Sequence, residues 1–199
     1  MIKIFLPLFL LFACEPSKVT ISEDTTQIAE EEPASLIHGG SPVPEEWDDC
    51  GGEIGDHPCN MSLVDQYSDT FELYDNYGKV IVLDFSSIWC GVCNMMAHDA
   101  QEFMDDYGDS NFLWVTILIE NDQGDPPTED DIQNWVNLYG IIDAPVVAGD
   151  RSLIDLTAES GWPIAAWPTL VVIDREMIVK YGINGWNETT IRTWVESEL

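Results

Sequence analysis

Two cysteines spaced C-x-x-C are the side chains in this sequence best suited to chemistry. Cys90 and Cys93 come directly after Trp89, at the end of the apolar run 80–85. That run predicts a buried strand and the residues after Cys90 predict a helix, so the pair falls at a strand-to-helix junction. The first turn of a helix has unpaired N–H groups and a partial positive charge, which stabilise a thiolate and lower the pKa of the first cysteine. The spacing therefore predicts a dithiol that opens and closes a disulfide.

The segments around the dithiol are expected to alternate between strands and helices. Apolar runs predict buried strands over 79–86 and 112–119, and an apolar stripe predicts one helix from Cys90 to Gly108. Further expected elements are a strand at 71–74, a helix at 128–140 capped by Thr128, a strand at 144–148, helical turns at 153–159, a strand at 170–173, a hairpin strand at 177–181 and a last helix from Glu188 capped by Asn187. This order predicts an α/β domain with a mixed central sheet flanked by helices.

The composition is that of an acidic chain with enough apolar residues to form a core. The 199 residues include 37 acidic and 7 basic ones, which gives a net charge of −30, and 45% are hydrophobic. Nucleic-acid binding and docking on an anionic bilayer both need clustered Lys and Arg, so the excess of carboxylates argues against both. A self-repelling, soluble surface explains the acidity more simply than a specific basic partner does.

The first residues have the pattern of an export signal. Lys3 precedes the apolar run 4–13, which is too short to span a bilayer. Leu11, Ala13 and Cys14 resemble a bacterial lipobox, and this resemblance implies cleavage before Cys14 and attachment of lipid to its sulfur. An ordinary secretory signal that is cut elsewhere is the alternative.

A tether and one folded domain are expected after this signal. Residues 15–45 contain many Glu and Pro residues and few large apolar ones, which favours an extended, flexible segment. We therefore expect a signal peptide at 1–13, a lipid-attachment cysteine with an acidic tether at 14–46, and the domain at 47–199. This arrangement predicts a protein outside the cytoplasm, held on a bacterial membrane by its N-terminal lipid anchor and facing the periplasm.

The two remaining cysteines are expected to form a structural disulfide. If Cys14 carries lipid, then Cys50 and Cys59, which lie in a Gly-rich loop, are left outside the redox pair. Two such cysteines outside the cytoplasm usually join in a disulfide. A metal site made of Cys50, His57 and Cys59 is the alternative, but it lacks an obvious fourth ligand. We therefore expect no metal.

The dithiol and a later Trp-Pro-Thr sequence together resemble the thioredoxin superfamily. The resemblance lies in segments 84–93 and 167–169 and extends over roughly residues 60–199. The extracytoplasmic, membrane-tethered thioredoxin-like reductases of the cytochrome c maturation type are the most similar. The resemblance implies a thioredoxin-like fold with a helix and a strand inserted between the C-x-x-C helix and a cis-proline. The peroxiredoxin branch shares this architecture but places its reactive cysteine differently, without a W-C-x-x-C motif.

The resemblance also implies roles for the residues of the site. Cys90 is the attacking thiolate and Cys93 is the resolving thiol. Asp84 matches the family's buried acid, whose pKa is raised by burial so that it accepts the proton of Cys93. Bonding of Asp84 to nearby backbone is the alternative. Pro168 matches the cis-proline that shapes the substrate groove. The substrate-facing positions are Trp89, Gly91, Val92, Trp167 and Thr169, although the two tryptophans could instead belong to the core.

We therefore expect a thiol–disulfide oxidoreductase that acts on protein disulfides, as a reductase with an upstream thiol electron donor and no cofactor. The alternatives are a disulfide isomerase or oxidase, a thiol peroxidase, and a non-catalytic binding module. The dipeptide Gly91-Val92 lacks the proline common in the family, and it leaves the direction of electron flow open because the reduction potential depends on it. Strand 112–119 has no Lys, so a cation that some relatives place near Asp84 is expected to be missing.

Overall fold

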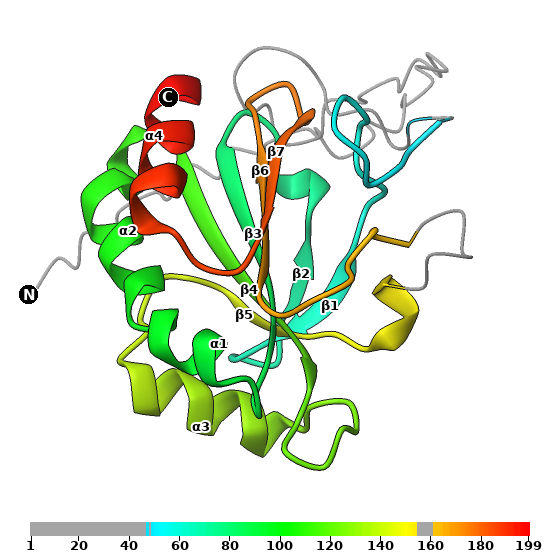
Figure 1. Ribbon diagram of the computed structural model, residues 1–199, viewed down its shortest axis with the longest axis vertical. Helices are drawn as coiled ribbons and strands as arrows, with labels where there is room; N and C mark the ends of the chain where they lie inside the picture. The colour runs from blue at the N-terminus through cyan, green and yellow to red at the C-terminus, as the bar shows by residue number, and fades with distance from the viewer. Residues whose placement is uncertain (1–46, 48, 155–160) are drawn as a thin grey trace, which may run out of the picture. The chain divides into compact units, whose positions relative to one another are not determined.

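A seven-stranded mixed sheet organises the part of the chain that the structure describes, namely residues 47, 49–154 and 161–199. The computed structural model orders its strands β2-β1-β5-β4-β3-β6-β7 (Figure 1). The strands are β1 (Ser62–Asp65), β2 (Thr70–Glu72), β3 (Val80–Ser87), β4 (Phe112–Glu120), β5 (Val146–Ala148), β6 (Thr169–Ile173) and β7 (Val179–Asn184). A mixed sheet with helices packed on it confirms the predicted fold class. The predicted signal peptide, Cys14 and the tether lie outside the described residues.

The centre of the sheet is formed by β3 and β4, which pair in parallel. Every residue of both strands is buried, as expected for near-continuous runs of Val, Ile and Leu that have no solvent-facing side. Strand β5 continues the parallel part of the sheet beyond β4, whereas β6 and β7 are added antiparallel on the other side of β3. The C-terminal ends of β3 and β4 therefore lie at one edge, where the dithiol follows β3.

Four α-helices and three short 3-10 helices accompany the strands in the described part of the chain. The α-helices are α1 (Gly91–Met96), α2 (Asp99–Tyr107), α3 (Glu129–Tyr139) and α4 (Glu188–Glu198), and the 3-10 helices are η1 (Tyr74–Asn76), η2 (Gly108–Ser110) and η3 (Arg151–Ile154). The predicted caps are present, because Thr128 and Asp131 form a capping box at the start of α3 and the Asn187 side chain accepts the Thr190 N–H in α4. Gly140 ends α3 with a positive φ of 68°, which glycine adopts without strain.

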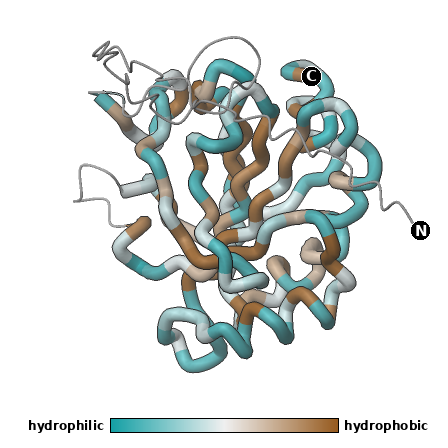
Figure 2. Tube along the Cα trace, turned by 180° about the vertical axis from the view of Figure 1, so that it is seen from behind, coloured by the Kyte–Doolittle hydropathy of each residue, from teal (hydrophilic) through white to brown (hydrophobic). Residues whose placement is uncertain are grey.

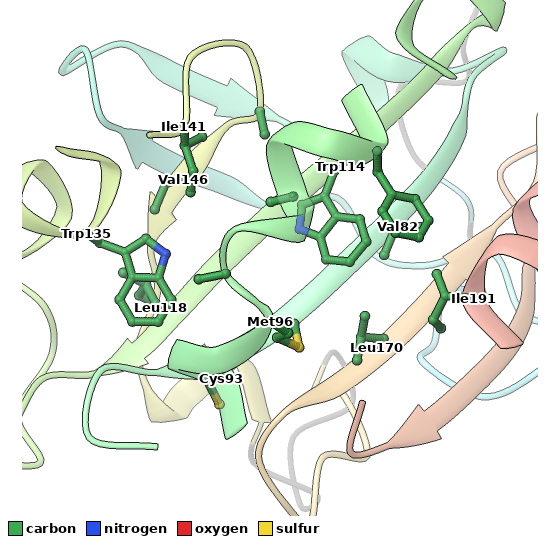
Figure 3. Packing of buried hydrophobic residues seen from close by; sticks show 14 of the residues in the cluster. Val82, Cys93, Met96, Trp114, Leu118, Trp135, Ile141, Val146, Leu170 and Ile191 are labelled. Carbon is green, nitrogen blue, oxygen red and sulfur yellow. The ribbon is translucent and has the colours of Figure 1, made fainter. Parts of the chain in front are cut away.

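Two hydrophobic clusters fill the opposite faces of the sheet, because successive strand side chains point to opposite sides. On one face Val80 and Val82 of β3 pack with Trp114 of β4 and with residues of all four α-helices (Figure 3). On the other face Leu83 and Phe85 pack in a second cluster. Figure 2 shows the same arrangement, since the apolar stretches follow the central strands and the polar ones follow the loops and helix surfaces.

The structure corrects the prediction of a single helix after Cys90. Helix α1 ends at Met96 and α2 begins at Asp99. The backbone at Ala97 and His98 stays in the right-handed helical region, so the buried stripe continues across the break although the helix is divided. The position of Val92 in that stripe was also predicted wrongly, because its side chain is 40% exposed.

The predicted strand at 71–74 is also divided. Residues Thr70–Glu72 form β2 and residues Tyr74–Asn76 form the 3-10 helix η1. Strand β1 was not among the predicted elements, because its side chains are only half-buried or exposed. It is defined by backbone pairing with β2 and β5. The predicted turns at 153–159 lie in part outside the described residues, and η3 occupies their beginning.

Within the described residues, none of the helices is both long and apolar enough to cross a membrane.

Arg192 of α4 contacts several residues of α2, and the two helices lie side by side in Figure 1. Its guanidinium group forms ion pairs of 2.7 Å with Glu102 and Asp106 of α2 and with Glu188 of its own helix. It also lies 4.4 Å from the centre of the Phe103 ring. A charge shared among several carboxylates and an aromatic face stabilises more than a single exposed pair.

We expect the change Arg192→Ala to lower the free energy of unfolding by about 1–2 kcal/mol, since it removes this whole network. Urea denaturation of the wild type and the variant measures the difference. Arg192→Lys is the matched variant: it keeps the charge but loses the planar fork, so we expect it to recover only part of the loss. Equal stability of the wild type and Arg192→Ala would contradict the prediction.

Candidate active site

The dithiol lies where the chain leaves β3 and enters α1. Cys90 is the N-cap of α1 in extended conformation, and the N–H of Cys93 donates to the Cys90 Sγ at 3.2 Å. The two cysteines are joined in a disulfide with their Cα atoms 5.2 Å apart. The residue exposures are 6% for Cys90 and 0% for Cys93. Cys90 is therefore the more accessible of the two cysteines, and its sulfur is the one that accepts a backbone N–H.

A change of register at the end of β3 directs the chain toward α1. The pairing of β3 with β4 shifts between Ser86 and Ser87, as in a β-bulge. Beyond it, the N–H of Ile88 donates to the carbonyl of Glu120 at 2.9 Å, and the N–H of Cys90 donates to the carbonyl of Ser87 at 3.0 Å. These bonds hold the turn against the edge of the sheet and fix where Cys90 is placed.

Asp84 lies in the middle of β3 on the face that carries the dithiol. Its side chain points to the same face of the strand as Val80 and Val82, which belong to the same cluster as Cys93. Its exposure is 1%, and it accepts hydrogen bonds from the Ser86 hydroxyl at 2.6 Å and the Thr116 hydroxyl at 3.2 Å. Burial raises the pKa of Asp84 to about 7, although both hydroxyl bonds act in the opposite direction. This carboxyl can therefore take up and release a proton near neutral pH.

The partners of Asp84 were not predicted from the sequence. Thr116 faces Asp84 across the β3–β4 register, and its hydroxyl also accepts the Trp114 indole N–H at 3.2 Å. A chain of hydrogen bonds thus runs from Trp114 through Thr116 to the carboxyl. The sequence signal was a threonine inside an otherwise apolar run, but only the register connects it to Asp84. In the structure two neutral hydroxyls, from Thr116 and Ser86, contact this acid.

Pro168 directly precedes β6, at the same end of the sheet as the dithiol. The Trp167–Pro168 peptide bond is cis. Thr169 pairs with Phe85 of β3 in the antiparallel register, which brings Pro168 beside the last residues of that strand. The Thr169 hydroxyl donates to the Ala166 carbonyl at 2.7 Å, and the Pro168 carbonyl accepts the Gly185 N–H at 2.7 Å. Trp167 is half-buried and packs against both hydrophobic clusters.

Trp89 supplies an exposed apolar surface beside Cys90. Its exposure is 50%, and Val92 is 40% exposed on the other side of the first cysteine. The indole N–H of Trp89 donates to Glu120 Oε2 at 2.9 Å, and the buried Glu120 carboxylate also forms an ion pair with Arg151. Glu120 and Arg151 were not predicted. Glu120 is the charged residue that ends the apolar run of β4, but its partners come from distant parts of the sequence.

The second cysteine pair lies apart from this site. Cys50 and Cys59 are joined in a disulfide, so both thiols that the alternative metal site would need are engaged. The ring of His57 stacks on Trp47 at 4.2 Å, and its Nδ1 is 2.7 Å from the Met177 carbonyl oxygen. The described residues contain no group of three or more His, Cys, Asp or Glu side chains that could hold a metal ion.

Comparison with protein families gives one matching model, described as the AhpC/TSA family, over residues 54–182. Among solved structures, a thiol:disulfide interchange protein of the thioredoxin family from Chlorobium tepidum TLS superposes with a TM-score of 0.59 at 21% identity, covering 75% of this chain and 99% of that one. The pneumococcal exposed lipoprotein thioredoxin Etrx1 from Streptococcus pneumoniae superposes with a TM-score of 0.57 at 24% identity, covering 71% and 100%. These similarities show a thioredoxin-like fold.

Two curated thioredoxins match a shorter stretch of sequence. Thioredoxin from Coprinus comatus is 31% identical over 52 residues, which cover 26% of this chain and 49% of that protein. Thioredoxin-1 from Schizosaccharomyces pombe is 33% identical over 57 residues, which cover 28% and 55%. The chain spans about half the length of the curated relatives it matches.

The raised pKa of Asp84 leads to a prediction about stability. The ordinary pKa is 3.8 and the folded value is about 7, so between these values the folded chain keeps a proton that the unfolded chain has lost. Stability therefore falls as the pH rises from about 4 to about 7, and the full penalty remains above that range. We expect Asp84→Asn to be more stable than the wild type by on the order of 2–4 kcal/mol near pH 8, and the gap to shrink toward pH 4.

Urea denaturation of the oxidised proteins at both pH values measures this gap. Asp122→Asn is the matched control, because it removes one carboxylate from an exposed position close in sequence to β4 and leaves the buried acid in place. A gap for Asp84→Asn that is the same at both pH values, or of opposite sign, would refute the prediction.

Proposed function

This chain belongs to the AhpC/TSA family, and we propose that it reduces protein disulfides through the Cys90–Cys93 dithiol. One observation carries the proposal. The pair lies at the junction of β3 and α1, and Asp84 is buried on the same face of the sheet with a pKa near neutrality. Attack by a thiolate and removal of a proton from a second thiol are the two needs of disulfide exchange.

The residues divide the reaction into two steps. The Cys90 thiolate attacks one sulfur of the substrate disulfide, which forms a mixed disulfide and releases the other substrate sulfur as a thiolate. Asp84 then takes the proton of Cys93, directly or through water, and the Cys93 sulfur attacks Cys90. The second substrate sulfur leaves, so the substrate gains two electrons and the Cys90–Cys93 disulfide is formed. An upstream thiol donor returns two electrons and restores the dithiol.

The exposed residues beside Cys90 are the proposed substrate surface. Trp89 and Val92 offer apolar area that a polypeptide can cover, while Cys93 is completely buried. Pro168 and Thr169 lie at the same end of the sheet and would form the opposite side of the groove. We propose this surface for protein disulfides because broad apolar contact suits an extended chain better than a small thiol.

We expect Cys90→Ser to abolish reduction of insulin disulfides with dithiothreitol as the electron donor, because no thiolate remains to attack. Cys93→Ser should accumulate a mixed disulfide at Cys90, since the resolving thiol is missing. Turbidity of reduced insulin measures the first result, and non-reducing electrophoresis with mass spectrometry measures the second. The double variant Cys50→Ser/Cys59→Ser is the control, since it removes the other disulfide and should keep the activity.

The outcomes also separate the proposal from its alternatives. Unchanged insulin reduction by Cys90→Ser would refute it, and inactivity of the wild type toward every disulfide would favour a binding module. Oxidation of Cys90 by hydrogen peroxide far faster than by insulin would favour a thiol peroxidase. A reduction potential near the oxidising end of the family range, about −120 mV rather than about −270 mV, would favour an oxidase or isomerase.

We further propose that the chain acts outside the cytoplasm as a lipoprotein anchored through Cys14, with residues 14–46 as a tether before the domain at 47–199. The lipobox-like residues Leu11, Ala13 and Cys14 support this, and one structural neighbour is described as an exposed lipoprotein thioredoxin. The Cys50–Cys59 disulfide agrees with an oxidising compartment.

Mass spectrometry of the protein expressed in a bacterium tests the anchor. We expect the mature chain to begin at Cys14 and to carry acyl chains, because each buried CH₂ contributes about 0.8 kcal/mol to membrane binding and several chains anchor firmly. Cys14→Ser should release the protein from the membrane fraction. An unmodified mature chain that begins at any other residue would contradict the anchor without touching the redox proposal.

A further inference from the structure

Asn94 connects both ends of the turn that presents the dithiol. It directly follows Cys93, and its side-chain Nδ2 donates to the Ile88 carbonyl at 2.7 Å and to the Cys90 carbonyl at 2.8 Å. Its backbone N–H donates to the same Cys90 carbonyl at 3.0 Å. One amide therefore joins the residue before Trp89 to the N-cap of α1, and it restricts how far Cys90 can move relative to the helix.

A residue of the inserted helix fixes the orientation of this amide. The Tyr139 hydroxyl donates to Asn94 Oδ1, so the Nδ2 must point the other way, toward the two carbonyls. Tyr139 is the last residue of α3, and its ring makes edge contacts with Trp135 at 4.7 Å and His98 at 5.0 Å. Helix α3 lies beside α1 in Figure 1, and Figure 3 shows Trp135 from α3 near the segment that carries Met96 and Cys93.

We propose that Asn94 and Tyr139 are positioning residues that hold Cys90 at the start of α1 and thereby raise the reduction potential of the Cys90–Cys93 pair. The proposal rests on the function proposed above and names what sets the electron affinity of that site. Neither side chain is expected to touch the reacting sulfurs, since Asn94 acts on the Ile88 and Cys90 carbonyls and Tyr139 acts on Asn94.

The direction of the effect follows from where the negative charge forms. The carbonyl bonds of Asn94 are already made in the disulfide state. A thiolate at Cys90 exists only in the reduced state, where it accepts the Cys93 N–H that now lies 3.2 Å from its sulfur. Holding Cys90 in place therefore stabilises the reduced state more than the oxidised one. A stabilised reduced state makes a dithiol more oxidising, so loss of the restraint should make the potential more negative.

Tyr139→Phe is the decisive variant, because it removes one hydroxyl and keeps the ring contacts. We expect its equilibrium constant for reduction by glutathione to be about tenfold lower than that of the wild type, which corresponds to a potential about 30 mV more negative. The pKa of the Cys90 thiol should rise in the same variant. Alkylation of the free thiols across a series of glutathione ratios, read by mass spectrometry, gives the potential, and the pH dependence of alkylation gives the pKa.

Tyr107→Phe is the matched control. It removes a hydroxyl that donates to Glu196 at 2.8 Å, between α2 and α4, so its potential should equal that of the wild type. Asn94→Ala should shift the potential at least as far as Tyr139→Phe, and the double variant should shift it no further than Asn94→Ala, because Tyr139 acts through Asn94. If the shifts in potential of the two single variants add up in the double variant, Tyr139 does not act through Asn94 and the proposal is overturned.

The proposal is also overturned if Tyr139→Phe lowers the free energy of unfolding but leaves the potential and the pKa of Cys90 unchanged, which would describe a structural residue only. A shift to a less negative potential, or an equal shift in Tyr107→Phe, would overturn it as well. If the wild-type pair does not exchange with glutathione at all, the proposed function fails instead, and the two failures are distinguishable.

Discussion

The parallel pairing of β3 with β4 is the interaction on which the rest of the site depends. Its register aligns Asp84 with Thr116 inside the sheet, and the shift after Ser86 releases the chain toward α1. The same strand therefore provides both the acid and the approach to Cys90. Because both strands are buried along their whole length, this register cannot slip without moving apolar side chains between the two faces of the sheet. The apolar core thus fixes the distance between acid and dithiol.

Burial of Asp84 places in the site a carboxyl that ionises near neutral pH, and its ionisation lowers the stability of the folded chain. A carboxyl in this apolar cluster would be neutral over much of the pH range if nothing bonded it, and a salt bridge would hold it ionised. The Asp84 carboxyl lies between these two cases, because the hydroxyls of Ser86 and Thr116 donate hydrogen bonds to it without adding charge. Its pKa of about 7 suits the proposed role, in which the carboxyl is ionised before it takes the proton of Cys93 and neutral afterwards. The ionised Asp84 carboxylate that the proposed reaction needs is therefore also the form that destabilises the folded chain.

The sequence predicts the features that depend on local patterns. Local patterns of adjacent residues predict the strands β3 and β4, the Thr128 cap and the junction around Cys90. The structure has all of them close to the expected positions. Strand β1 could not be predicted, because it has little burial of its own and one of its two partners, β5, is far away in the sequence. The bond of Thr116 to Asp84 has the same origin, since it follows from the register between two strands. The division into α1 and α2 was missed because the apolar stripe continues across it.

The segment inserted between α1 and the cis-proline contacts the turn that precedes α1. Helix α1 has only six residues and cannot by itself hold the turn that precedes it. Two anchors from the insertion reach this turn: Arg151 through Glu120 to Trp89, and Tyr139 through Asn94. If Asn94 and Tyr139 position Cys90 as proposed, the potential of the pair depends on the second anchor as well as on the two residues between the cysteines. The absence of a proline from that dipeptide does not by itself determine the direction of electron flow, because Asn94 and Tyr139 contact the turn from outside the dipeptide.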